Sequence, residues 1–425
     1  MPNDQSPPAH RLSRRSVLAL LGAAPIAVSG AAVALTASAE ASSDPPDPPS
    51  GPPPPSLRPG GAYERFVAGL AARDMFSGTV LLAWHGRPVL VRSYQFANRQ
   101  LNIPNQADTS FFLASLTKFF TGLAVTQLAA QGKVALHETL GLYLDGFPAA
   151  MADTVTVHQV LTHTSGIPDF SMSPAWQQEF RSWRTNEAAF EGTLSVIRQL
   201  TLAFTPGSNY AYSNSGYILA AAIVASASGQ AFWDYVPQQI FAPAGMTRTG
   251  FFSGQQWLTD PGIAHNYGPR QADGQHQDLT PLIAQGPNGW NAAGGAFSSA
   301  PDLLRFARAL QQGKLLSPAW TEVTTSGKHP ISPAQQNPDE APSQGTWIGY
   351  GTEERIVGGQ HAFGHTGALE LFVSPGSPPG GGSTSLSIYP DLDVVAVVLS
   401  NYFLSPGIGT FLAQQDRIIV SGHGS

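Results

Sequence analysis

One stretch decides the fold of this chain: Phe111-Phe112-Leu113-Ala114-Ser115-Leu116-Thr117-Lys118-Phe119-Phe120. If a helix begins at Ser115, the spacing to Lys118 puts both side chains on one face, about 5–6 Å apart. A serine hydroxyl is a weak nucleophile until a base takes its proton, and a lysine whose charge is suppressed by burial can help. The free amides at a helix N-terminus favour developing negative charge. The stretch therefore predicts a nucleophilic serine with a lysine beside it.

The same spacing also has a purely structural interpretation. Ser115 would then cap a helix through its hydroxyl, and Lys118 would point into solvent. A serine three residues before a lysine does not separate the two interpretations. The rest of the chain has to decide between them.

The N-terminal residues predict export followed by a spacer. Arg14-Arg15 precede an apolar run from Val17 to Ala37, which ends at the small-residue sequence Ala37-Ser38-Ala39. This pattern is typical of a cleaved twin-arginine signal over residues 1–39, the alternative being a membrane anchor. Residues 40–61 are rich in proline and predict an extended linker. We therefore expect a secreted protein without a permanent membrane anchor.

Composition excludes some classes of protein. Charged residues make up 12% of the 425 residues, the formal net charge is −6, and no basic run follows the signal. Nucleic-acid binding is therefore not expected. The chain has no cysteine, which excludes a disulfide framework. The remaining length is ample for a single large domain with its own core.

The order of apolar segments predicts an α/β (α+β) domain over residues 62–425. Buried strands are predicted near both ends of this domain, and helices and loops in between. We expect an antiparallel sheet built from both chain ends and flanked by helices. The α/β part would comprise about 62–120 and 346–425, and a mainly helical lobe would comprise about 121–345.

Two further motifs follow the serine stretch. Tyr212 and Asn214 lie in a polar loop before an apolar helix, and His365-Thr366-Gly367 lie in a strand-like segment. A phenol can shuttle a proton if a nearby lysine lowers its pKa, and an amide can orient a substrate. The structural alternative is a buried tyrosine beside an Asx turn.

Together, the three motifs resemble those of serine hydrolases related to class C β-lactamases. Ser115-x-x-Lys118, Tyr212-x-Asn214 and His365-Thr366-Gly367 occur in the same order as in that superfamily. It also holds penicillin-binding D-alanyl-D-alanine carboxypeptidases, D-aminopeptidases and family VIII carboxylesterases. The similarity covers about residues 62–402. It implies a β-lactamase/transpeptidase-like fold.

The resemblance implies a role for each matching residue. Ser115 would attack a carbonyl group and form an acyl-enzyme, while Lys118 and Tyr212 manage its proton. The backbone amides of Ser115 and Ala368 would form the oxyanion hole. The residues expected to bind substrate are Asn214, His365, Thr366, Gly367 and Ala368.

The substrate class stays open between related chemistries. The His-Thr-Gly form resembles secreted carboxypeptidases more than the Lys-Thr-Gly of dedicated class C β-lactamases. A D-alanyl-D-alanine carboxypeptidase or related D-amino-acid peptidase is therefore the first expectation. A family VIII-type carboxylesterase or a weak β-lactamase is the alternative, and a non-catalytic penicillin-binding sensor is the alternative from another class. Small-molecule or peptide substrates are expected, with no cofactor or metal; the sequence leaves the oligomeric state unknown.

Two charged residues bear on that choice. Arg355 is a candidate for binding a terminal carboxylate, as an arginine does in the related peptidases, although an exposed structural arginine is commoner. Glu370 follows the His-Thr-Gly motif, where such proteins usually carry a glycine, and we expect it close to the substrate.

Overall fold

The computed structural model describes one compact unit beginning at Gly51. The signal expected over residues 1–39 lies outside the described residues, as does the first half of the expected linker. Within the expected linker, Pro55–Leu57 form a turn (η2) whose Leu57 side chain is fully buried. The described residues are 51–287, 291–331, 345–372 and 377–422.

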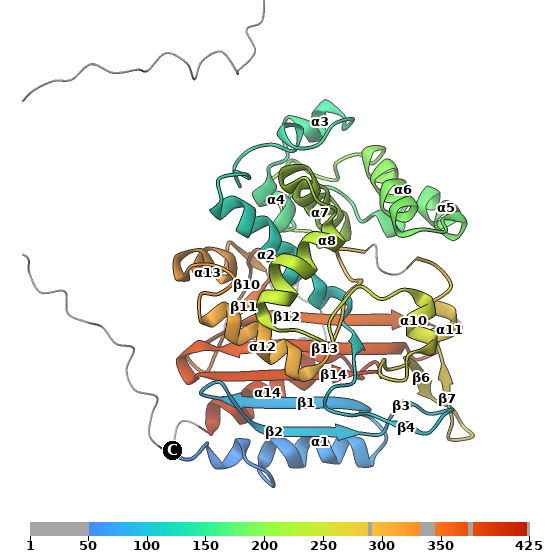
Figure 1. The fold of residues 1–425 in the computed structure, drawn as a ribbon, viewed down its shortest axis with the longest axis vertical. Helices are drawn as coiled ribbons and strands as arrows, with labels where there is room; N and C mark the ends of the chain where they lie inside the picture. The colour runs from blue at the N-terminus through green and yellow to red at the C-terminus, as the bar shows by residue number, and fades with distance from the viewer. Residues whose placement is uncertain (1–50, 288–290, 332–344, 373–376, 423–425) are drawn as a thin grey trace, which may run out of the picture. The chain divides into compact units, whose positions relative to one another are not determined.

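The core of this unit is an antiparallel sheet, which has ten strands among the described residues. Both ends of the domain contribute to it, because β1 pairs with β14 near the C-terminus as well as with β2. Figure 1 shows these strands running side by side across the domain. Along the sheet they are β2 (Arg87–Tyr94), β1 (Gly78–Trp84), β14 (Val394–Ser400), β13 (Gly380–Tyr389), β12 (Gln360–Leu371), β11 (Glu353–Val357), β10 (Thr346–Ile348) and β9 (His329–Ile331), with β6 (Tyr267–Arg270) and β7 (His276–Asp278) joined through β13.

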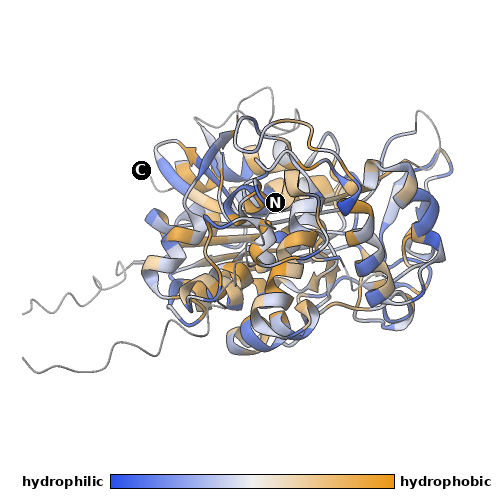
Figure 2. Cartoon of the chain, turned by 90° about the horizontal axis from the view of Figure 1, so that it is seen from above, coloured by the Kyte–Doolittle hydropathy of each residue, from blue (hydrophilic) through white to orange (hydrophobic). Residues whose placement is uncertain are grey.

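Both faces of the sheet are covered, so the neighbouring strands β1 and β14 are apolar at almost every position. Successive side chains point to opposite faces. On β1, Val80 and Leu82 pack on one face with α1 (Ala62–Ala72) and α14 (Ile408–Ser421). Leu81 and Ala83 pack on the other face with the central helices. Figure 2 shows hydrophobic residues concentrated in the interior of the domain.

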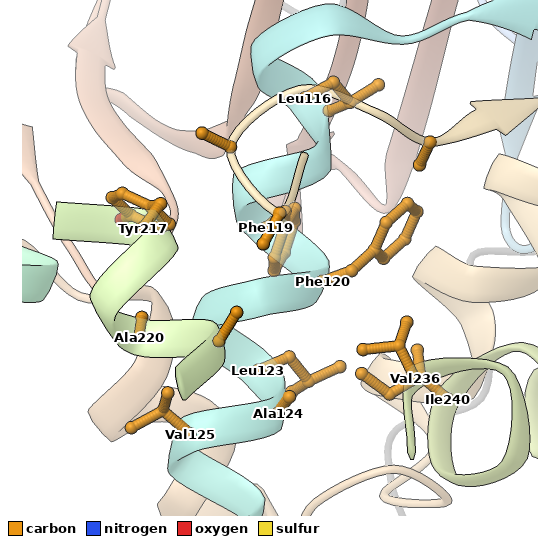
Figure 3. Close-up of a cluster of buried hydrophobic side chains, with 14 of the residues drawn as sticks. Leu116, Phe119, Phe120, Leu123, Ala124, Val125, Tyr217, Ala220, Val236 and Ile240 are labelled. Atoms are coloured by element: carbon orange, nitrogen blue, oxygen red, sulfur yellow. The ribbon is translucent and has the colours of Figure 1, made fainter. Parts of the chain in front are cut away.

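Helix α2 (Thr117–Ala130) is the central helix of the second face. All its residues from Thr117 to Ala129 are buried, so it lacks the polar face of a surface helix. Phe120 packs edge to face against Phe241 and Phe306 at ring distances of 5.0 and 4.9 Å. Figure 3 shows side chains of α2 packed against Tyr217, Val236 and Ile240. Truncating a buried phenylalanine here to alanine would cost about 3–5 kcal/mol.

The predicted layout is confirmed: strands from both chain ends enclose a mainly helical segment. That segment also supplies β6, β7 and β9, so the sheet draws on more of the chain than expected. Two short pairs stand apart, β3 (Phe96–Asn98) with β4 (Ile103–Pro104) and β5 (Phe111–Phe112) with β8 (Phe297–Ser298). The other helices are α3 (Ala149–Ala152), α4 (Val157–Leu161), α5 (Pro174–Glu179), α6 (Asn186–Arg198), α7 (Asn214–Ser228), α8 (Phe232–Val236), α9 (Ala242–Ala244), α10 (Gly254–Thr259), α11 (Thr280–Ile283), α12 (Ala300–Gln311) and α13 (Pro318–Thr325).

No single helix within the described ranges is long and apolar enough to cross a membrane. The pair 214–228 and 232–244 meets the length and composition of a span only as a unit bent by 77°.

Candidate active site

Ser115 lies in a short 3-10 turn, η3 (Ala114–Leu116), that leads into α2. We expected an α-helix to begin at Ser115 itself. Instead Ala114 has φ of 48°, a left-handed value uncommon for alanine, so the chain turns sharply just before the serine. Hydrogen bonds fix this elbow, because Leu113 N donates to Ala296 O at 2.9 Å and Thr384 Oγ1 donates to Leu113 O at 2.7 Å. The partly exposed Ser115 is thereby held at a rigid corner.

Lys118 is fully buried and contacts Ser115. Its Nζ lies 3.1 Å from Ser115 Oγ, 2.7 Å from Asn214 Oδ1 and 2.8 Å from Ala293 O. The last two atoms only accept hydrogen bonds. A neutral amine fits this environment, because its two N–H groups serve the two acceptors and its lone pair faces the serine. Burial lowers the pKa of Lys118 to about 7, against the opposing effect of Asp169 and Glu353.

The carbonyl acceptor comes from residues 292–296, the segment that precedes α12. Thr121 Oγ1 donates to Ala292 O at 2.6 Å, and Ala296 N donates to Thr117 Oγ1 at 3.1 Å. These bonds hold the segment along the first turn of α2, which places Ala293 O at the lysine. Sequence reasoning missed this contact, because a backbone carbonyl leaves no mark on the sequence.

Tyr212 contacts the same serine from the opposite lobe. Its hydroxyl lies 2.7 Å from Ser115 Oγ, and its ring centroid lies 4.9 Å from Lys118 Nζ. The residue is 41% exposed, and the hydroxyl points inward at the serine. We expected the lysine to lower the pKa of this phenol. Burial instead raises the pKa of Tyr212, so the phenol keeps its proton at neutral pH.

Asn214 binds the lysine through an orientation that Asp169 fixes. Asp169 Oδ2 accepts from both the backbone N and Nδ2 of Asn214, each at 2.8 Å. The amide oxygen must therefore face Lys118. Asp169 Oδ1 accepts from the N and Oγ of Ser171, so the carboxylate is fully engaged. Sequence analysis missed Asp169; the only signal was its place as the cap of a short turn after Gly166.

His365 lies on β12 and is buried beside the lysine. Its Nδ1 donates to Thr366 O at 2.5 Å, and burial, with the Lys118 charge, lowers the pKa of His365 to about 3. Burial also lowers the pKa of His163, whose ring lies 4.4 Å from that of Tyr212. Both imidazoles are therefore neutral, and neither adds a cation to the site. Among the described residues, no cluster of side chains could hold a metal ion.

Strand β12 approaches the elbow closely because of Gly367. A Cβ at this position would lie 2.0 Å from Leu113 O and 2.4 Å from Thr384 Oγ1. Gly367 is buried, while Thr366 is partly exposed and Ala368 is exposed. The third predicted motif therefore lines the turn that carries Ser115.

The structure corrects the expectation for Arg355. Its Nε and Nη2 bind the two carboxylate oxygens of Asp416 on α14 at 2.9 and 2.8 Å. Asp416 belongs to the face of the sheet covered by α1 and α14, away from α2. Arg355 is thus a largely buried structural residue that is already paired and not free for a substrate carboxylate. Glu370 is exposed on β12, two residues beyond Ala368.

Comparison with protein families gives one match over most of the chain. The Beta-lactamase family matches residues 63–420, which contain every predicted site residue.

Individual proteins similar to this chain include penicillin-binding proteins and an esterase. Penicillin-binding protein 4* of Bacillus subtilis is 30% identical over 317 residues, covering 72% of this chain and 66% of the relative. Esterase EstB of Burkholderia gladioli is 31% identical over 199 residues, covering 45% of this chain and 50% of the relative. The crystal structure of a penicillin-binding protein from Bacillus halodurans has 28% identity and a TM-score of 0.61, covering 78% of this chain and 94% of that one. The two curated matches thus span between half and two thirds of the relatives' length.

Proposed function

The chain belongs to the beta-lactamase family of serine hydrolases, and from that premise we propose that it cleaves an amide or ester bond through an acyl-enzyme on Ser115. The observation that carries this proposal is the pair of contacts at Ser115 Oγ. Lys118 Nζ lies at 3.1 Å and Tyr212 OH at 2.7 Å. Both distances lie within hydrogen-bond range, so Lys118 can act as a base and Tyr212 as an acid on the same nucleophile.

In the first step the neutral amine of Lys118 takes the proton of Ser115 as Oγ attacks the substrate carbonyl carbon. The amine is able to do so because its N–H groups are held by Asn214 and Ala293 and its pKa is about 7. Negative charge develops on the carbonyl oxygen. The backbone amides of Ser115 and Ala368 would stabilise it, each typically contributing about 3–4 kcal/mol.

In the second step the carbon–heteroatom bond breaks and the leaving group needs a proton. The protonated phenol of Tyr212 supplies it, and the Lys118 ammonium restores the phenol. An amine or alcohol departs, and the acyl group stays on Ser115. Hydrolysis of the acyl-enzyme runs the same transfers in reverse, with water in place of the leaving group.

For the substrate, we propose a D-alanyl-D-alanine or related D-amino-acid peptide bond as the first candidate. The His365-Thr366-Gly367 form and the similarity to penicillin-binding proteins support it. An ester is the second candidate, favoured by the engagement of Arg355 with Asp416 and by the similarity to esterase EstB. A non-catalytic sensor is disfavoured, because Lys118 is buried against Ser115 rather than exposed. We also propose that the signal at residues 1–39 exports the protein.

The test uses purified full-length protein, its Ser115→Ala variant and a matched Ser195→Ala control on the exposed side of α6. Each protein is incubated with a penicillin while intact mass is followed, and then with a D-Ala-D-Ala peptide and a short-chain nitrophenyl ester. We expect an adduct or turnover that Ser115→Ala lowers by at least about 10³-fold and Ser195→Ala leaves unchanged. Equal activity of all three proteins would overturn the proposal. Turnover of the peptide supports the first candidate, and turnover of the ester alone supports the second.

A further inference from the structure

Glu353 is a carboxylate close to the site that the proposed mechanism does not use. It is the first residue of β11, where it pairs with Gly364 of β12. β12 runs on to Leu371 and stays paired with β13 along its other edge. No described strand pairs with β12 beyond Gly364 on the β11 side. Glu353 therefore lies at the corner where the free edge of β12 begins.

This corner adjoins the third motif. Residues opposite each other in an antiparallel pair share a face, so Glu353 lies on the same face as Gly364 and, two residues on, Thr366. Gly364 has no side chain to cover the glutamate. The diagonal distance from Glu353 to Thr366 in such a pair is roughly 7–8 Å, within reach of a long side chain. Both residues are partly exposed, so a substrate lying along His365–Ala368 passes this carboxylate.

The charge of Glu353 is not neutralised by direct pairing. Its carboxylate makes no hydrogen bond or ion pair within the described ranges. Arg355, on the same face, acts on it at a distance while binding Asp416. The charge of Glu353 in turn acts on Lys118 and Tyr212. Burial raises the pKa of Glu353 to about 7, so the group ionises increasingly above neutral pH.

In the described part of the chain, Arg355 and Lys118 are the cations whose charges act on Glu353, and neither forms an ion pair with it. Lys118 is likewise the lysine whose charge acts on the neighbouring His163 and His365. The segments 288–290, 332–344 and 373–376 contain no lysine or arginine in the sequence. The site thus combines the anions Asp169 and Glu353 with one lysine whose charge is suppressed.

We propose that Glu353 determines specificity, selecting acyl substrates with an uncharged or cationic group beside the scissile bond over those with a free carboxylate there. This inference rests on the proposed acyl-enzyme function. In a peptide cleaved at its last bond, the terminal carboxylate belongs to the residue after the scissile bond, whose Cα lies about 3.8 Å from the preceding one. It must therefore enter the site. Of the candidate substrates proposed above, this inference favours amides and esters of D-amino-acid peptides, which lack that charge, over a D-Ala-D-Ala peptide with a free C-terminus.

The experiment compares pairs of substrates that differ by one carboxylate. One pair is an acyl-D-Ala-D-Ala peptide with a free C-terminus and the same peptide as its carboxamide. The other is 4-nitrophenyl acetate and 3-carboxy-4-nitrophenyl acetate, which reports even where peptides are not cleaved. We expect wild type to favour the uncharged member in kcat/KM by at least about tenfold. Glu353→Gln should reduce that ratio toward one by raising activity on the charged member.

Three controls make the result specific. Glu191→Gln removes an equal charge from an exposed position on α6, and it should leave the ratio unchanged. Glu353→Asp keeps the charge and should keep the preference, which guards against a folding defect in the glutamine variant. Removing the Glu353 charge should also move the acid limb of the pH–rate profile to lower pH, because that charge raises the pKa of Lys118.

The outcomes separate this inference from the function on which it rests. A wild-type preference for the free carboxylate would overturn the role of Glu353, as would a ratio that Glu353→Gln and Glu191→Gln change equally. Ser115-dependent ester turnover would still support the proposed function in either case. Ester turnover that persists in Ser115→Ala would overturn the proposed function and this inference with it.

Discussion

Two cations are buried on opposite faces of the same sheet, and their surroundings differ in kind. Lys118 is held by the oxygens of an amide and a backbone carbonyl, at 2.7 and 2.8 Å, and beside a serine. Arg355 is held by both carboxylate oxygens of Asp416, and Ser387 and Tyr389 accept from it as well. Lys118 is therefore bound by neutral dipoles, whereas Arg355 is bound by a charged carboxylate.

The difference sets the protonation state of each group. Burial penalises a charge, and dipoles at Lys118 offset only part of that penalty, so the pKa of the amine falls to about 7. Burial also acts to lower the pKa of Arg355, but the Asp416 carboxylate outweighs it and raises that pKa above its ordinary value. A buried cation without a paired carboxylate becomes a base, while one with a paired carboxylate becomes part of the scaffold.

The largest effect is expected from a variant that makes the Lys118 site resemble the Arg355 site by placing a permanent positive charge there. Lys118→Arg places an always-charged group at the lysine position, so the base is lost even though the positive charge remains. We expect kcat/KM to fall by at least about 10³-fold. Wild-type activity should rise with pH through about 7, because only the neutral amine accepts the serine proton. A steady-state pH profile with an ester substrate measures both effects.

Lys118→Met is the control for that prediction. It removes the amine while keeping the length and apolar stem of the side chain, and it should be as inactive as Lys118→Arg. An active arginine variant would show that positive charge, rather than a base, is what Ser115 requires.

Removing the Asp416 carboxylate that pairs with Arg355 should lower the stability of the fold rather than the catalytic activity. Asp416→Asn leaves the largely buried Arg355 without a counter-charge, and we expect the free energy of unfolding to fall by about 3–5 kcal/mol. Denaturant titration followed by fluorescence measures this loss. Activity per folded molecule should stay within about twofold of wild type, since Asp416 is bonded to Arg355 and not to Ser115, Lys118 or Tyr212. Lost activity at unchanged stability would instead place Arg355 in the site.

A smaller effect is expected from Tyr212→Phe. The variant keeps the ring and removes the hydroxyl 2.7 Å from Ser115 Oγ, which should slow acylation by roughly 10–100-fold, the value of a hydrogen bond to a charged group. Time-resolved intact-mass measurement of the acyl-enzyme reports the rate. Tyr94→Phe on β2 serves as the matched control. Unchanged acylation would assign the whole proton transfer to Lys118.

The smallest effect is expected from Arg355→Lys. Lysine keeps the charge opposite Asp416 but loses the two parallel hydrogen bonds of the guanidinium. We expect a loss of about 1–3 kcal/mol in the free energy of unfolding, less than for Asp416→Asn. Equal losses in the two variants would mean that geometry, rather than charge pairing, stabilises this site.

Local spacing made part of the site predictable. Ser115 and Lys118 lie three residues apart, and the geometry of one turn brings them together whatever surrounds it. Tyr212 and His365 were found because three motifs recur in order, which also gave the family. The layout of the sheet followed from the order of the apolar segments. These inferences needed no knowledge of which segments pack together.

Other features depended on contacts between distant segments. Ala293 O reaches Lys118 from 175 residues away, and Asp169 orients Asn214 from 45 residues away. The face of the sheet on which Arg355 lies depends on strand register, since a shift of one residue would turn its side chain to the other face. No pattern in the sequence records these distances.

The sequence by itself determined the order of elements, the family and the reacting pair, because helical spacing and ordered motifs are local properties. Only the tertiary structure decided the protonation states. The sequence suggested that a nearby lysine could make the phenol of Tyr212 more acidic, whereas burial raises its pKa. Lys118 and Arg355 differ as base and scaffold because burial and partner charge are fixed by which segments the fold brings into contact.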